Sequence, residues 1–276
     1  MADRPAWLRK KIGGILLDIS GVLYNANEGG GEAIPGSAEA VKKLKAAGYK
    51  VQFCTNEDTC TREQLVLKLG QFGFNLSANE LLAPSPVARK ILQDRKLRPL
   101  LLIHPKGLAE YEGVDCTNPN CVVVGGAEDQ FTYARMNEAF RLLLTSDNPV
   151  LFALGHGRYY RSGSNLVLDA GPYVKALEFA CDVQAEVIGK PSASFFLTAL
   201  DKIQVLPEDA VMIGDDIVSD VGGAQACGIR GVQVRTGKYR PEDENHPAVK
   251  PDGYVDNLAQ AVELILKYNC AEYYTE

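Results

Sequence analysis

Acidic residues follow the ends of two apolar runs in this chain. The first run ends at Asp18, and the second ends in Gly214-Asp215-Asp216, with Asp220 one helical turn further on. Carboxylates gathered at the carboxyl ends of parallel strands repel one another unless a cation neutralises them, and an all-oxygen site selects a hard ion such as Mg²⁺. The alternative role, negative charge at a helix N-terminus, accounts for one of these carboxylates but not for all of them. The pattern therefore predicts a magnesium site.

Two further segments carry groups that suit phosphate. Thr55 and Asn56 end a third apolar run and supply a hydroxyl, an amide and backbone donors, although the pair alone is an ordinary strand-to-loop cap. Lys190, in the segment IGKP, is placed to neutralise both a phosphate and a nucleophile. A solitary lysine is usually a solvated side chain, so the evidence for a role of Lys190 is its position in the order of these motifs along the chain. Together these segments predict a magnesium-dependent phosphoryl-transfer site.

The elements that must position these residues alternate between strand-length apolar runs and stretches of helical period. This alternation is typical of an α/β protein built on a parallel sheet. The expected strands span residues 13–19, 49–55, 210–213, 231–234 and 253–255. The expected helices span residues 37–47, 61–72 and 257–267, with Ser37 as the N-cap of the first and Gly48 and Gly73 ending the first two.

The middle of the chain has its own strand and helix signals. Strands are expected within residues 98–105, 120–126 and 149–155, and helices near 131–145 and 173–181. We therefore predict an inserted domain over residues 84–187, between core segments 1–83 and 188–276.

The segment GHGRYYR at 155–161 brings together polar side chains within this insert. His156, Arg158 and Tyr159 are candidates for contact with a small or protein-borne phosphorylated substrate. The competing interpretation, a hairpin turn with ordinary packing tyrosines, is slightly favoured.

Composition excludes several classes of function. The 276 residues include 29 Lys and Arg against 35 Asp and Glu, a formal net charge of -6, so no broad nucleic-acid surface is expected. No apolar stretch has the length of a membrane span, and the charged N-terminus lacks a signal peptide's apolar segment. Seven scattered cysteines do not form a disulfide framework. We expect no membrane partner and a cytoplasmic location, with nuclear presence as a further expectation.

The order of the four motifs resembles that of the haloacid dehalogenase superfamily of phosphatases: DxxG, then TN, then KP, then GDDxxxD. The resemblance implies an α/β fold with a Rossmann-like parallel-sheet core. It also implies an α/β cap of the C2 type, inserted between the second and third motifs. It further suggests a homodimer formed through the cap.

The resemblance also implies a role for each motif residue. Asp18 would be the nucleophile and a metal ligand, Ser20 would bind Mg²⁺ through its backbone carbonyl, and Asp215 would be the other main ligand. The implied substrate-binding residues are Asp18, Ile19, Ser20, Thr55, Asn56 and Lys190. Asp216 and Asp220 would support the metal directly, through water or from behind the ligands.

Ser20 departs from the superfamily pattern, which usually has a second aspartate at this position. That aspartate protonates the leaving oxygen, a contribution of ~10² to 10⁴-fold that a serine hydroxyl does not supply. Imidazole and phosphate leave without it, because their conjugate acids titrate near ~6 to 7. A phosphoramidate can also take its proton on nitrogen before cleavage. We therefore expect hydrolysis of phosphohistidine, phospholysine and pyrophosphate through an aspartyl phosphate, in agreement with the resemblance.

Two alternatives remain open at this point. One is a phosphomonoesterase of the same capped group, acting on phosphoglycolate, pyridoxal phosphate or nitrophenyl phosphate. The other is a catalytically weakened protein-binding module, which the presence of Asp18, Thr55, Lys190 and Asp215 disfavours.

Overall fold

A parallel sheet forms the larger part of the protein, as the sequence predicted, and it has six strands: the five expected ones and β5 (Leu81–Leu82), which was not expected. The computed structural model describes residues 4–26, 30–162 and 165–269. The strand order is β14-β13-β12-β1-β4-β5, and every neighbouring pair is parallel. The strands in that order are β14 (Gly253–Val255), β13 (Arg230–Val234), β12 (Ala210–Gly214), β1 (Gly14–Leu17), β4 (Lys50–Cys54) and β5 (Leu81–Leu82).

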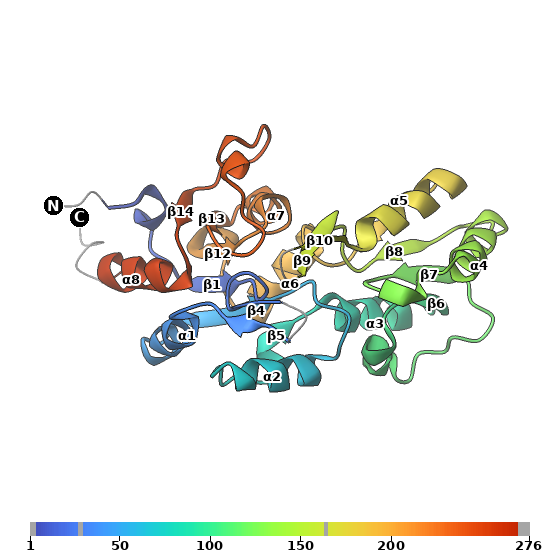
Figure 1. Cartoon of the computed structure of the whole chain (residues 1–276), viewed down its shortest axis with the longest axis horizontal. Coiled ribbons are helices and arrows are strands. Elements are labelled where there is room, and N and C mark those ends of the chain that lie inside the picture. Colours follow the sequence, from blue (N-terminus) through green and yellow to red (C-terminus); the bar gives the residue numbers. More distant parts are fainter. Residues whose placement is uncertain (1–3, 27–29, 163–164, 270–276) are drawn as a thin grey trace.

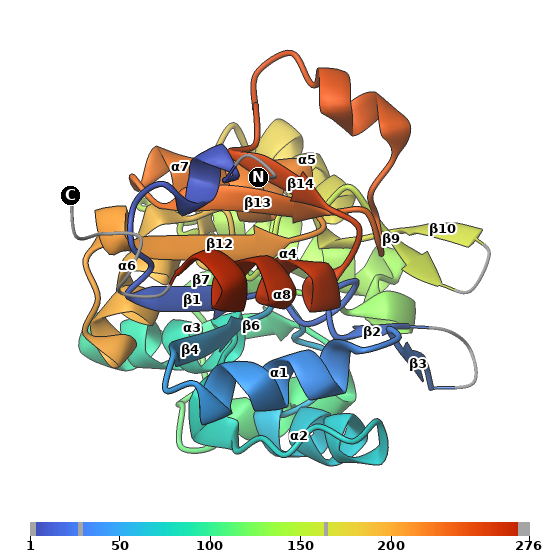
Figure 2. The ribbon, with the colours of Figure 1, turned by 90° about the vertical axis from the view of Figure 1, so that its left-hand side faces the viewer.

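Both faces of this sheet are covered, which explains why β1 is apolar throughout. Ile15 and Leu17 pack in the cluster that contains residues of α1 (Ser37–Ala46), α2 (Arg62–Gln71) and α8 (Leu258–Tyr268). Leu16 packs on the other face, with residues of α6 (Ala193–Ile203) and α7 (Gly223–Ala226). Figure 2 shows α8 and α1 lying side by side over one face of the sheet. A strand buried on both faces reads as a continuous apolar run, as in other parallel sheets.

The predicted cap of the first helix was wrong by one residue. Gly36 is the N-cap residue, with a left-handed φ of +78°, and α1 begins at Ser37. The Ser37 hydroxyl donates instead to the carbonyl oxygens of Leu23 (2.8 Å) and Ile34 (2.6 Å). Ser37 therefore ties the helix to the loop that follows β1. Ile34 is a local partner, three residues away, but Leu23 is 14 residues away and local spacing does not predict its contact.

A second, four-stranded parallel sheet lies within the chain between β5 and α6, in the order β11-β8-β7-β6. Its strands are β6 (Pro99–Leu102), β7 (Cys121–Val124), β8 (Leu151–Ala153) and β11 (Glu186–Val187). Helices α4 (Tyr133–Leu144) and α5 (Ala170–Cys181) pack on one face and α3 (Pro84–Asp94) packs on the other. Figure 1 shows this inserted domain beside the core. The α/β core with an inserted α/β cap matches the predicted fold class.

Two short antiparallel pairs accompany the main sheets. β2 (Tyr24–Asn25) pairs with β3 (Glu32–Ala33) shortly after β1. β9 (Tyr159–Ser162) pairs with β10 (Asn165–Leu168), so the GHGRYYR segment leads into a hairpin. Within the described ranges, no helix combines the length and apolar character needed to cross a membrane.

Candidate active site

Asp18 lies directly after β1, at the carboxyl end of the central strand. Its backbone N–H donates to the carbonyl oxygen of Ile213 (3.0 Å), which continues the pairing of β1 with β12. Lys190 Nζ is 2.6 Å from Asp18 Oδ1 and 2.6 Å from Asp220 Oδ1, and it also donates to the Cys54 carbonyl oxygen (3.0 Å). Burial would lower the pKa of Lys190, but Asp18 and Asp220 outweigh it, so the pKa is raised and the side chain remains a cation.

Three buried carboxylates surround this lysine. Ligand atoms of Asp18, Asp215 and Asp220 all lie within 4.8 Å of one another. Burial raises the pKa of Asp215 and that of Asp220, and the negative charge of Asp18 raises both further. Three carboxylates and one ammonium leave a formal charge of -2, which a divalent cation would neutralise. The all-oxygen, buried donor set therefore fits Mg²⁺.

Asp216 lines the same cavity but is not part of this group of three. Its Oδ1 accepts from the backbone N–H groups of Val218 (3.0 Å) and Ser219 (2.9 Å), and so caps the turn over Ile217–Gly222. Its Oδ2 lies 3.1 Å from Lys238 Nζ. Burial would raise the pKa of Asp216, but Lys238 and the two amides lower it. The helix-N-terminus role considered for the acidic motif describes Asp216 in this arrangement.

Thr55 and Asn56 follow β4 and reach the site in different ways. Thr55 is buried at the cavity wall, and its Oγ1 accepts from the backbone N–H of Glu57 (3.0 Å). The Asn56 amide is bound on both sides to Lys190: Nδ2 donates to the Lys190 carbonyl (2.9 Å), and Oδ1 accepts from the Lys190 N–H (2.9 Å). The structure thus places Asn56 where it fixes the backbone of the lysine.

Ser20 and Ile19 differ in their access to the site. Ser20 is half-buried and lines the cavity, and its Oγ lies 3.5 Å from Tyr24 Oη. The Ile19 side chain is fully buried in the core, and Ile19 is not among the residues that line the cavity.

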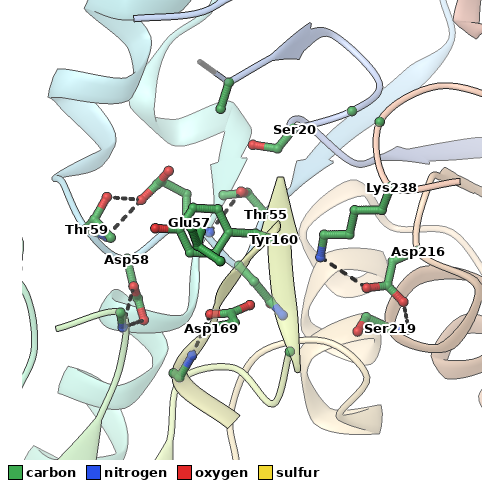
Figure 3. A pocket seen from close by; sticks show the side chains of 18 of the residues that line it. Ser20, Thr55, Glu57, Asp58, Thr59, Tyr160, Asp169, Asp216, Ser219 and Lys238 are labelled. Atoms are coloured by element: carbon green, nitrogen blue, oxygen red, sulfur yellow. Dashed lines mark hydrogen bonds and ion pairs between the residues drawn. The ribbon is translucent and has the colours of Figure 1, made fainter. Parts of the chain in front are cut away.

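A cavity of about 780 Å³ opens above these residues, between the core and the inserted domain. The insert contributes Gly126, Phe131, Tyr160, Asp169 and Tyr173, among others, to its walls. Figure 3 shows Glu57, Asp58 and Thr59 on one side of the pocket and Lys238, Asp216 and Ser219 on the opposite side. Substrate bound to Asp18 would therefore contact both parts of the chain.

Comparison with known proteins gives the family. A model of the haloacid dehalogenase-like hydrolases matches residues 15–117, and one described as HAD-hydrolase-like matches residues 187–261. The chain is 54% identical over 265 residues to the phospholysine phosphohistidine inorganic pyrophosphate phosphatase of Danio rerio, covering 96% of this chain and 98% of the relative. It is 57% identical to the protein of that name from Homo sapiens, with 92% and 94% covered. The chain belongs to the haloacid dehalogenase-like hydrolases.

A solved structure has the same fold as this hydrolase. The 4-nitrophenylphosphatase of Thermotoga maritima superposes with a TM-score of 0.83 at 26% identity, covering 93% of this chain and 98% of that one. The core and the insert are both included in that coverage, so the hydrolase shares its two-part architecture with that phosphatase.

The predicted cap residues of the hydrolase lie along a neighbouring cavity of about 710 Å³. His156, Arg158 and Tyr159 line that cavity, and the Arg240 guanidinium lies 5.7 Å from the centre of the Tyr159 ring. Tyr160, the next residue of β9, lines the main cavity. Successive side chains of a strand point to opposite faces, and the sequence alone does not show which tyrosine faces the site.

Several cavity residues were not singled out from the sequence. Asp169 is the N-cap of α5 and accepts from the Ala170 N–H (2.7 Å), while Glu57 and Lys238 stand on loops after β4 and β13. Asp58 accepts from the Gly126 N–H with Oδ1 (3.0 Å) and Oδ2 (3.1 Å), which joins the core to the insert. Burial raises the pKa of Asp58 to about 8, with Glu57 adding to the rise. Glu57 and Asp58 directly follow the Thr55-Asn56 motif, and this position next to a predicted site residue was the signal that could have identified them.

Proposed function

We propose that this hydrolase is a magnesium-dependent phosphatase. It cleaves the P–N bonds of phosphohistidine and phospholysine, and it also cleaves the bridging bonds of pyrophosphate (P–O–P) and imidodiphosphate (P–N–P). The observation that carries the proposal is Ser20, which lines a site that otherwise retains the nucleophile, lysine and carboxylates. The names of the relatives from Danio rerio and Homo sapiens support these substrates.

Asp18 acts as the nucleophile in this proposal. Lys190 holds its Oδ1, which leaves the second oxygen to attack phosphorus in line. The new Asp18 oxygen–phosphorus bond forms as the P–O or P–N bond breaks, and the electrons of the broken bond leave with the departing group. For phosphohistidine and phospholysine the departing side chain takes a proton from solvent before cleavage, so it leaves as neutral imidazole or amine. Water then attacks phosphorus, releases inorganic phosphate and regenerates the Asp18 carboxylate.

The residues around Asp18 supply the positive charge and the donors that the transferring group needs. Asp18, Asp215 and the Ser20 carbonyl would hold Mg²⁺, with Asp220 and Asp216 in support. When bound, Mg²⁺ neutralises charge on the phosphoryl oxygens. Thr55 lines the cavity wall beside them, and Asn56 keeps Lys190 in place through two hydrogen bonds.

A second candidate function is a phosphomonoesterase of the same capped group. The name of the structurally similar Thermotoga maritima protein, 4-nitrophenylphosphatase, favours it, and nitrophenolate also leaves without strong acid assistance. A protein-binding module is the third candidate. The buried Lys190 and its two carboxylates weigh against it, since a binding surface needs no such cluster.

A panel of substrates separates these candidates. Phosphate release would be measured from phosphohistidine, imidodiphosphate, pyrophosphate and several alkyl phosphates, with and without Mg²⁺, using Asp18→Asn as the blank. We expect Mg²⁺-dependent release from the first three to exceed release from alkyl phosphates by about 10² or more. Preference for alkyl esters would support the phosphomonoesterase, and release equal to the blank on every substrate would support the binding module.

Location, assembly and domain limits are proposals of the same kind. We propose a cytoplasmic and nuclear enzyme that forms a homodimer through the insert and acts on small phosphorylated molecules or phosphohistidine and phospholysine proteins. The proposed domain limits are residues 84 and 187. In support of these limits, α3 begins at Pro84 and β11 ends at Val187.

A further inference from the structure

The segment Thr236-Gly237-Lys238, in the loop after β13, packs directly on the active site. The Thr236 hydroxyl donates to the carbonyl oxygen of Gly21, and Gly237, with φ of +62°, lies against Gly21 and the Asp215 carboxylate. The Lys238 backbone N–H donates to Asp215 Oδ2 (2.7 Å). Because Asp215 lies in the same carboxylate group as Asp18, these contacts fix the position of Lys238 relative to the nucleophile.

The Lys238 ammonium has capacity for a further ligand. Its Nζ lies 3.1 Å from Asp216 Oδ2, and its side chain is 28% exposed. An ammonium has three N–H donors, so two remain beyond the one given to Asp216. Lys190 differs, because its side chain is only 4% exposed and donates to Asp18, Asp220 and the Cys54 carbonyl.

Charge is divided across the cavity. Among the described residues that line it, Lys190 and Lys238 are the cationic side chains. Five other lining residues on the loop after β4 and on the insert have carboxyl groups: Glu57, Asp58, Glu128, Asp129 and Asp169. Figure 3 shows Lys238 on the side of the pocket opposite Glu57. An anionic leaving group would be repelled by these carboxylates. Of the two lysines, Lys190 already donates to Asp18, Asp220 and the Cys54 carbonyl, so Lys238 is the one with donors left for such a group.

We propose that Lys238 binds the departing phosphate of a diphosphate substrate and thereby determines whether the enzyme accepts anionic leaving groups. This inference rests on the proposed phosphatase function and specifies which side chain receives the second phosphate. As the Asp18 oxygen–phosphorus bond forms, the bridging oxygen leaves with its electrons on the second phosphate. The two Lys238 N–H groups donate to the non-bridging oxygens of that phosphate. Amine and imidazole leaving groups carry no such oxygens and do not use this contact.

The test measures binding rather than turnover. Calorimetry with the full chain and Mg²⁺ would compare methylenediphosphonate, which has two phosphonates, with methylphosphonate, which has one. We expect Lys238→Met to weaken methylenediphosphonate binding by about tenfold or more and to change methylphosphonate binding by less than about twofold. Lys238→Arg should retain most of the affinity. Lys90→Met is the matched control, since Lys90 on α3 is likewise paired with an aspartate, Asp94, and lies outside the lining of both cavities.

The outcomes separate this proposal from a structural role and from the proposed function. If Lys238→Met weakens both phosphonates equally, the lysine only holds Asp216, and the proposal is overturned. Equal affinity of the wild type for both phosphonates would overturn it as well. If the wild type shows the expected binding difference but hydrolyses no substrate in the panel, Lys238 stands as the diphosphate contact and the proposed phosphatase function fails.

Discussion

At the scale of single residues, Ser20 is the position at which the site lacks an acidic group. Asp18, the proposed nucleophile, lies 2.6 Å from Lys190 Nζ, and the carboxylates Asp215 and Asp220 lie beside it. Ser20 lines the cavity without a carboxyl group to donate a proton. Bond cleavage therefore depends on how readily the leaving group departs by itself.

Restoring an acid at this position should change the substrate preference. We expect Ser20→Asp to raise turnover of simple alkyl phosphates relative to imidodiphosphate by about tenfold or more, because alkoxides need a proton to leave. The measurement is the ratio of the two kcat/KM values. Ser20→Asn is the matched control, since its side chain has a similar size and no acidic proton. An unchanged ratio in Ser20→Asp would refute the role of Ser20 as a substrate filter.

The sequence predicted these residues by type but could not supply their contacts. Asp18 and Asp215 follow apolar runs that form adjacent strands, so their meeting follows from the order of a parallel sheet. The two hydrogen bonds from Asn56 to Lys190 join residues 134 positions apart, and no spacing rule gives them. The sequence likewise did not predict that Lys238 lies at the site, because the turn at Gly237 brings it to Asp215, a residue 23 positions away.

At the scale of elements, the strands were predicted better than the ends of helices and the faces of hairpins. A strand buried on both sides has a long apolar signature, as β1 and β12 have. The first helix has Gly36 as its N-cap, and the Ser37 hydroxyl binds the carbonyl oxygens of Leu23 and Ile34 instead of capping the helix. In β9 the sequence named Tyr159 as a candidate for substrate contact, but Tyr160 lines the main cavity and Tyr159 lines the neighbouring one.

The contact between the loop after β4 and the end of β7 makes the protein sensitive to pH. The folded chain keeps the Asp58 proton up to about pH 8, whereas the unfolded chain releases it near 3.8. The folded state therefore binds more protons between these values, so stability falls as pH rises from 3.8 to about 8. Glu57 and Asp169 strengthen this effect because they also disfavour the charged carboxylate.

The variant Asp58→Asn should remove this dependence, since an amide keeps the acceptor for Gly126 but does not ionise. We expect the difference in free energy of unfolding, variant minus wild type, to increase by up to about 1.4 kcal/mol per pH unit between pH 5 and pH 8. Urea unfolding at several pH values measures the difference, and Asp94→Asn provides an exposed control on α3. A difference that stays constant across this range would contradict the assigned cause.

At the scale of the whole molecule, the core supplies the reacting groups and the insert encloses them. Asp18, Lys190 and Asp215 come from the carboxyl-end loops of the core, while Tyr160 and Asp169 come from the insert. The proposed chemistry and the proposed choice of leaving group, through Ser20 and Lys238, therefore both belong to the core, and the insert completes the wall of the cavity. Their relative position depends on contacts such as the one between Asp58 and Gly126.

The carboxylate group links metal binding to the stability of the whole chain. Without a cation, Asp18, Asp215 and Asp220 repel one another in a buried site, which costs folding free energy. A ligand that binds only the folded chain stabilises it by about 2.7 kcal/mol at 100 times its Kd. For a chain of this size we expect Mg²⁺ at that concentration to raise Tm by about 5 to 10 °C.

Asp215→Asn should change both the Tm without Mg²⁺ and the rise in Tm that Mg²⁺ produces. Its Tm without Mg²⁺ should equal or exceed that of the wild type, because one of three like charges is gone, and the rise with Mg²⁺ should be lost. Thermal unfolding monitored by circular dichroism over a series of Mg²⁺ concentrations gives both values. Asp209→Asn, an exposed carboxylate paired with Lys10, should keep the full rise. If wild type and Asp215→Asn respond equally to Mg²⁺, the ion binds elsewhere, and the buried carboxylates are neutralised by protons instead.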